Sequence, residues 1–153
     1  MTTRRWCSRN LCEGTGWDGP GAYRIRLIRN GEPVPIRRFN GVDDEGILAI
    51  GCSSNIERRR KQFIRASSGK HGHSEGIQWY LVTNSSRFRD RYSQGGYSLQ
   101  FDFIKTKSRE EAERIEEEEI WIYFEKYSET PPLNAAIPGR EKKFDELRCT
   151  RAH

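Results

Sequence analysis

Three consecutive arginines at the start of a predicted helix are the strongest candidates in this sequence for binding a phosphate. The segment "GILAIGCSSNIERRRKQF" (46–63) holds a short apolar run, a glycine, a serine-rich turn and then Arg58, Arg59 and Arg60. Successive helical residues advance about 100°, so Arg60 falls within the apolar stripe, Arg59 lies at its margin and Arg58 points away. Spacing alone leaves two interpretations for Arg59 and Arg60: a phosphate site, or side chains that reach past the core to water.

A run of four glutamates is the second candidate for chemistry. Glu116–Glu119 are consecutive, so their carboxylates spread around nearly the whole circumference of a predicted helix, and the flanking residues leave no clean polar face. We therefore expect at least one carboxylate to lie against protein or to line a cleft, where it needs an arginine, a lysine or a metal ion. An arginine that grips phosphate and one inward carboxylate are the ingredients of metal-assisted phosphodiester cleavage, although a structural Arg–Glu pair uses the same ingredients.

The size and charge of the chain limit the number of domains and the kinds of partner that we expect. A chain of 153 residues suits one domain, and its net charge of +5 favours a polyanionic partner as much as it fits an ordinary basic protein. The N-terminal ten residues lack the apolar region of a secretory signal, and no apolar run approaches the roughly 20 residues that span a bilayer. We expect a cytoplasmic protein with reduced cysteines and no membrane partner.

The hydrophobic pattern predicts an α+β fold with a small, mostly antiparallel sheet of three to four strands flanked by helices. The predicted strands are 22–28, 47–50, 77–82 and 97–104, and the predicted helices are 54–66 and 108–127. Ser54 and Glu57 have the spacing of a capping box, and Asn30-Gly31 is a hairpin signal.

Three segments describe the predicted organisation of the chain. Residues 1–20 are a glycine-rich loop extension, 21–137 the folded domain, and 138–153 a basic tail. The tail is predicted to form a short helix or to fray. It is more often a solvated segment than a DNA clamp, and both interpretations stay open.

Five motifs in order resemble the GIY-YIG nuclease domain. They are "GAY" (21–23), "AIG" (49–51), "SSNIERR" (53–59), the acidic helix and "PPLN" (131–134). The resemblance runs through residues 21–134 and implies a three-stranded sheet flanked by helices. It also implies divalent-metal-dependent cleavage of one DNA strand or both, with Mg²⁺ or Mn²⁺ as the cofactor. Whether the DNA is branched or of specific sequence, and how many copies of the chain assemble, stays open.

The resemblance assigns the main roles in such a site. Tyr23 would activate or position the attacking water, although a strand tyrosine packed in the core is the alternative. Arg59, eight residues after the glycine of "AIG", would hold the scissile phosphate in place of Arg60. Glu118, three residues before Trp121, would bind the metal, with Glu119 as the runner-up.

Two further positions match less specific parts of the family pattern. Asn134, after the proline pair, would brace the site. His71 and His73 both fall where some members carry a histidine, and we favour His73.

This chain also departs from the family at two positions. Ala49 replaces the tyrosine of the second motif, and Phe63 stands where a histidine is frequent. Tyr80 is a candidate to restore the missing hydroxyl. These departures leave two hypotheses: a metal-dependent DNA endonuclease, or a related module that binds nucleic acid or a partner protein without cleaving it.

Overall fold

Strand β2 lies at the centre of an antiparallel sheet. The computed structural model describes residues 4–151, and β2 pairs with β7 on one side and with β6 and the short β3 on the other. The five strands are β1 (Cys7–Asn10), β2 (Gly21–Arg29), β3 (Glu32–Pro33), β6 (Ile47–Ser53) and β7 (Tyr97–Lys105). A separate two-stranded ribbon consists of β4 (Ile36–Arg37) and β5 (Val42–Asp43). The predicted α+β class is confirmed.

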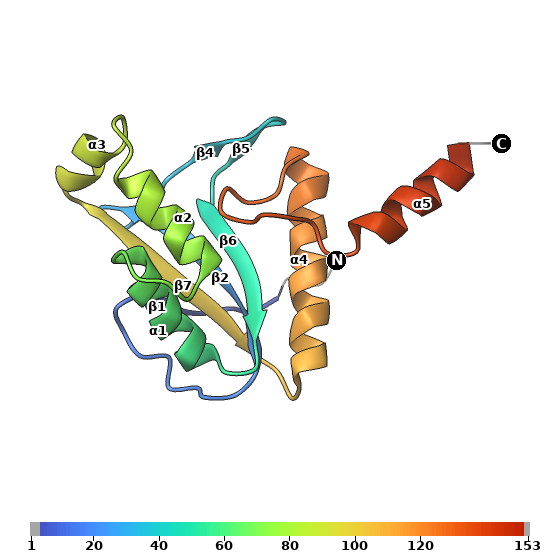
Figure 1. The fold of residues 1–153 in the computed structure, drawn as a ribbon, viewed down its shortest axis with the longest axis horizontal. Coiled ribbons are helices and arrows are strands. Elements are labelled where there is room, and N and C mark those ends of the chain that lie inside the picture. Colours follow the sequence, from blue (N-terminus) through green and yellow to red (C-terminus); the bar gives the residue numbers. More distant parts are fainter. Residues whose placement is uncertain (1–3, 152–153) are drawn as a thin grey trace.

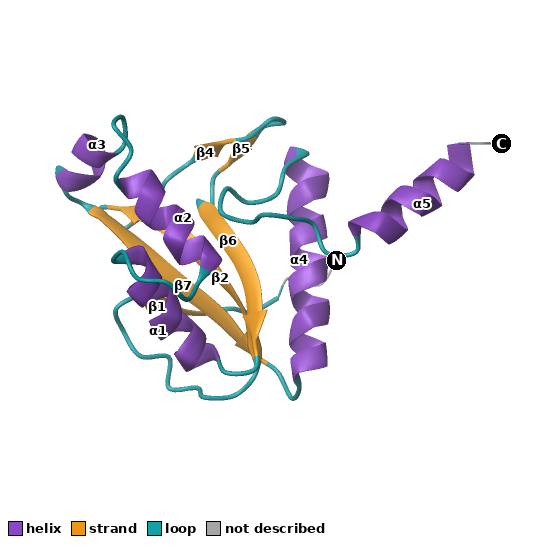
Figure 2. Cartoon of the chain, viewed as in Figure 1, coloured by secondary structure: helices purple, strands orange, loops and turns teal. Residues whose placement is uncertain are grey.

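Helices cover both faces of this sheet (Figures 1 and 2). The helices are α1 (Ile56–Ser67), α2 (Ser74–Thr83), α3 (Arg89–Ser93), α4 (Arg109–Tyr127) and α5 (Arg140–Arg151). Helices α1 and α2 pack together on one face, whereas α4 packs on β2 and β6 from the other. Helix α5 extends away from the rest of the molecule in Figure 1. Within residues 4–151, no helix combines the length and the apolar character needed to cross a membrane.

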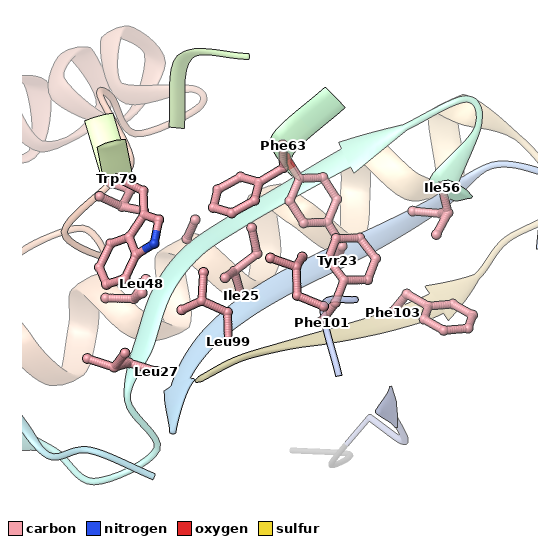
Figure 3. Packing of buried hydrophobic residues seen from close by; sticks show 13 residues of the cluster. Tyr23, Ile25, Leu27, Leu48, Ile56, Phe63, Trp79, Leu99, Phe101 and Phe103 are labelled. Carbon is pink, nitrogen blue, oxygen red and sulfur yellow. The ribbon is translucent and has the colours of Figure 1, made fainter. Parts of the chain in front are cut away.

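The alternation of β2 explains how the two faces differ. Tyr23, Ile25 and Leu27 are buried in the larger apolar cluster, which also contains side chains of α1 and α2 (Figure 3). Arg24 and Arg26 point to the opposite face, where the Nε atom of each donates to Asp102 at 2.7 Å. Asp102 is completely buried, so this carboxylate is compensated by two guanidinium groups.

The strand predicted over 77–82 is wrong, because this segment belongs to helix α2. His73 caps the helix, and Gly76 lets it approach α1 closely: a Cβ at Gly76 would lie 2.7 Å from the Cβ of Ala66. The run of large apolar residues has no strict alternation, and a short apolar run does not by itself distinguish a helix from a strand.

Two other local expectations need correction. The predicted N-terminal loop contains β1, which pairs with β7 and whose four residues are all exposed, so no apolar pattern marks it. The cap of α1 is Asn55, whose side chain accepts from the N–H of Arg58, and not Ser54. The turn at Asn30-Gly31 is confirmed, with φ of 50° and 82° at the two residues.

Candidate active site

The phenol of Tyr23 lies directly over the glycine that ends the "AIG" motif. A Cβ atom at Gly51 would lie 2.4 Å from the hydroxyl oxygen of Tyr23, and the two residues are register partners on β2 and β6. The ring of Tyr23 is 1% exposed and stacks on Phe101 at 5.3 Å between centroids. The glycine is therefore required by a close approach, since no other residue leaves room for the phenol.

Hydrogen bonds join Tyr23 to side chains from α1 and α2. The Tyr23 hydroxyl donates to Oε2 of Glu75 at 2.9 Å, and Nε of Arg59 donates to the same hydroxyl oxygen at 3.4 Å. His73 places its Nε2 atom 3.4 Å from that oxygen. The structure thus brings the predicted residues Tyr23, Arg59 and His73 together, and it adds Glu75.

His73 is held in one tautomer by its position at the N-terminus of α2. Its Nδ1 atom accepts from the N–H of Gly76 at 3.3 Å, so in the neutral ring the proton sits on Nε2. That nitrogen is hydrogen-bonded to the hydroxyl oxygen of Tyr23 at 3.4 Å and lies 3.2 Å from Oε2 of Glu75. Burial and the nearby charge of Arg59 lower the pKa of His73 to about 4, so the imidazole is neutral at neutral pH. His71, the alternative to His73, is exposed.

Burial also raises the pKa of two other groups in the site. Burial, followed by the charge of Glu75, raises the pKa of Tyr23 well above its ordinary value. The phenol therefore keeps its proton at neutral pH, and it is a hydrogen-bond donor and acceptor rather than a base. Burial likewise raises the pKa of Glu75, although its hydrogen bond to Tyr23 and the charge of Arg59 act in the opposite direction.

Glu116 of α4 is half-buried, and its charge acts on Arg59 and Glu75 of this site. Burial raises its pKa, and the Cys52 thiol and the charges of Arg109 and Arg59 lower it. Glu116 in turn acts on the pKa of Glu75, so the two carboxylates interact. Cys52 belongs to β6, which pairs with β2 alone and so forms an edge of the sheet in the described chain. The site therefore spans this edge, with α1 and α2 on one side and α4 on the other.

Glu118, the predicted metal ligand, does not lie with these groups. Arg4 forms ion pairs with both Glu118 and its runner-up Glu119, and the latter pair is 2.7 Å apart. Residues two apart on a helix point in nearly opposite directions, so Glu116 and Glu118 cannot serve the same surface. Four consecutive glutamates give no sign in the sequence of which one faces the protein, so the spacing could not distinguish Glu116 from Glu118.

Asn134 closes the hydrogen bonding of β6 next to the site. Its side chain accepts from the N–H of Ile50 at 2.9 Å and donates to the carbonyl of the same residue at 2.8 Å. Leu133 donates its backbone N–H to the carbonyl of Leu48 at 2.8 Å. The segment after the proline pair thus satisfies the outer edge of the strand that precedes Gly51.

Core residues occupy both positions at which the chain departs from the family pattern. Ala49 and Phe63 are completely buried, and the ring of Phe63 meets that of His73 edge-on at 5.4 Å. Tyr80 is 39% exposed on α2 and forms no hydrogen bond with Tyr23 among the described residues, so it does not replace the missing hydroxyl.

The donors present suit a hard divalent cation that keeps most of its water. Within residues 4–151, no three His, Cys, Asp or Glu side chains form a group that could hold a metal ion. Glu116 is a half-buried carboxylate, and Mg²⁺ in phosphate chemistry is typically held by one or two carboxylates together with waters and substrate oxygens. The residues present fit that kind of site.

Sequence reasoning missed Glu75 and Glu116 as members of this group. Glu75 follows a histidine at the start of a helix that was predicted as a loop followed by a strand.

Comparison of the chain with protein-family models, curated proteins and solved structures finds no match.

Proposed function

We propose that this chain is a metal-dependent endonuclease that hydrolyses DNA phosphodiester bonds, of the GIY-YIG type. The observation that carries the proposal is the environment of Arg59. Its Nε atom is engaged by the neutral phenol of Tyr23, and within residues 4–151 no carboxylate lies within 4.0 Å to form an ion pair with it. Its remaining contact is a 3.4 Å hydrogen bond from Nη1 to Gln62.

A guanidinium in this state is suited to a phosphate. Arginine binds phosphate oxygens through two parallel N–H groups and stays charged at any working pH. Arg59 is half-buried, so its charge is less screened than that of an arginine in open solvent. Charge that develops on the scissile phosphate during attack by water would be stabilised by this fixed donor.

Glu116 would hold the metal on the other side of the same sheet edge. When bound, Mg²⁺ or Mn²⁺ supplies a Lewis acid that withdraws charge from the phosphate oxygens. Tyr23 would act as a neutral phenol that holds Arg59, because its raised pKa argues against the role of a base. The exposed Arg58, Lys61 and Arg65 of α1 offer further cations to flanking phosphates.

Nicking of supercoiled plasmid in Mg²⁺ or in EDTA tests the proposal. We expect metal-dependent nicking by the wild type, and a loss of at least about 100-fold in Glu116→Gln. Glu125→Gln is the matched control, since Glu125 is an exposed glutamate of the same helix. Equal nicking by the two variants would refute the role of Glu116, and nicking that survives EDTA would refute metal dependence.

Binding without cleavage is the second candidate function. The buried Ala49 favours it, because the hydroxyl of the second motif is absent and Tyr80 does not supply another. Salt-sensitive binding of duplex DNA with no nicking under any metal condition would support this alternative.

A further inference from the structure

We infer that Glu75 is a positioning residue that fixes the direction of Arg59 by acting through the phenol of Tyr23. The inference deepens the proposed function and rests on it. Glu75 is 9% exposed, lies at the start of α2 and has no direct ion pair with Arg59 among the described residues. The link between the two charges is the hydroxyl of Tyr23, which donates to one and accepts from the other.

The geometry gives each side chain in this series of hydrogen bonds one role. Oε2 of Glu75 accepts the Tyr23 O–H at 2.9 Å, and Nε2 of His73 lies 3.2 Å from the same carboxylate oxygen. Because the phenol proton is committed to Glu75, the oxygen of Tyr23 presents its lone pairs to Nε–H of Arg59. The terminal nitrogens of the guanidinium are then left to face a phosphate.

A carboxylate does this better than a neutral acceptor would. A charged acceptor forms hydrogen bonds roughly twice as strong as a neutral one, and a chain of hydrogen bonds polarises along its length. The negative charge of Glu75 therefore strengthens the hold of Tyr23 on Arg59. The groups that face Glu75 are Tyr23 from β2, Arg59 from α1, His73 before α2 and Glu116 from α4.

The same carboxylate costs stability. Its pKa is raised in the folded state, so folding favours its protonated form. Its contribution to stability is greatest below the unfolded pKa of about 4.3 and falls as the pH rises through the folded pKa. A residue kept only for structure would not be expected to carry this cost. Glu75→Gln should therefore be at least as stable as the wild type at neutral pH.

Glu75→Gln is a suitable test because glutamine fits the same space. Oε2 of Glu75 accepts the Tyr23 O–H, and the amide oxygen of glutamine can take its place. The side chain is 12% exposed, so the amide nitrogen has access to water at the other position. The variant keeps the acceptor and removes only the charge.

The experiment combines three readouts on wild type, Glu75→Gln and the control Glu125→Gln. We expect thermal unfolding of Glu75→Gln at or above the wild-type temperature, and plasmid nicking slower by about 10- to 100-fold at saturating DNA. In ¹⁵N NMR spectra without metal or DNA, the Nε–H signal of Arg59 should shift in Glu75→Gln alone.

The NMR readout separates this inference from the proposed function. A wild type that never nicks DNA, but whose Arg59 signal responds to Glu75→Gln, would overturn the nuclease and keep the positioning role. An unchanged Arg59 signal together with an unchanged nicking rate would overturn the positioning role. Lowered stability with no effect on the Arg59 signal would also overturn it, since Glu75 would then be a structural residue.

Discussion

Two adjacent arginines of α1 have opposite surroundings. Arg60 uses its whole side chain within the protein: Nε and Nη2 donate to Glu57 at 2.9 and 2.6 Å, and Nη1 donates to the carbonyl of Leu11 at 2.7 Å. Within residues 4–151, the side chain of Arg59 makes only two hydrogen bonds, each of 3.4 Å and each to a neutral group. One cation is fully satisfied by protein partners, and the other keeps donors free for a ligand.

The carboxylates beside these arginines differ in the same way. Glu57 touches its arginine directly, and the hydrogen bonds from Arg60 lower its pKa to about 2. Glu75 reaches Arg59 only through Tyr23, and burial raises its pKa. A direct pair stabilises both charges, whereas the indirect arrangement leaves both charges only partly compensated. We therefore interpret the first cluster as structural and the second as functional.

Replacing each arginine in turn should produce the largest contrast. Arg60→Met leaves Glu57 without its partner and the Leu11 carbonyl without its donor, so we expect a loss of about 3–5 kcal/mol in the free energy of unfolding. Arg59→Met should stay within about 1 kcal/mol of the wild type, since Arg59 has no ion pair to lose. Urea denaturation measures both values. The contrast fails if Arg59→Met is the more destabilised variant.

Adding one methyl group at Gly51 should disrupt the hydrogen bonds between Arg59, Tyr23 and Glu75. It should leave the contacts of Arg60 unchanged. The new Cβ would meet the phenol of Tyr23 at 2.4 Å, so the ring must move away from Glu75 and Arg59. Overpacking of this kind costs about 1–3 kcal/mol, and we expect nicking to be lost as well. Gly14→Ala is the control, because its Cβ would meet no atom within 4 Å. Wild-type stability and nicking in Gly51→Ala would contradict the account.

The effect confined to the narrowest range of conditions is a change in the acid dependence of stability. The folded pKa of Glu57 lies near 2 and the unfolded pKa near about 4.3, so the folded state binds this proton more weakly. The stability from Glu57 is present above about pH 4.3 and is lost as the pH falls toward 2, by at most about 1.4 kcal/mol per pH unit.

Arg60→Met should reduce this loss of stability at acid pH, because Glu57 then recovers an ordinary pKa. His73 titrates in both proteins, so the difference between their urea midpoints across acid pH isolates Glu57. Identical acid limbs in the two proteins would show that Arg60 does not control the pKa of Glu57.

The sequence predicted the framework of this molecule better than its site. Strict alternation marked β2 and β7, and the position of Arg59 was chosen by resemblance to a family pattern. The spacing of Glu57 and Arg60 was visible in the sequence as a helical i, i+3 pair, and it could have assigned Arg60 to structure. The sequence also gives Glu57 the spacing of a capping box with Ser54, so two roles compete for one carboxylate.

The remaining parts depended on tertiary contacts that no local pattern records. Glu116 and Glu118 are chemically identical, and only the packing of α4 on β6 decides which one faces Cys52. The position of Glu75 beside Tyr23 depends on the helical conformation of the segment after His73 and on its packing against α1. Strand β1 consists of four exposed residues without an alternating apolar pattern, and it is held by pairing with β7 at the sheet edge.

The most direct test is the rate of Mg²⁺-dependent plasmid nicking by Arg59→Met, measured beside wild type and Arg65→Met. Arg65 is an exposed arginine on the same helix, so it controls for the loss of one positive charge. The account predicts a loss of at least about 100-fold for Arg59→Met and a change of a few-fold at most for Arg65→Met. Nicking by Arg59→Met at the rate of Arg65→Met would contradict it.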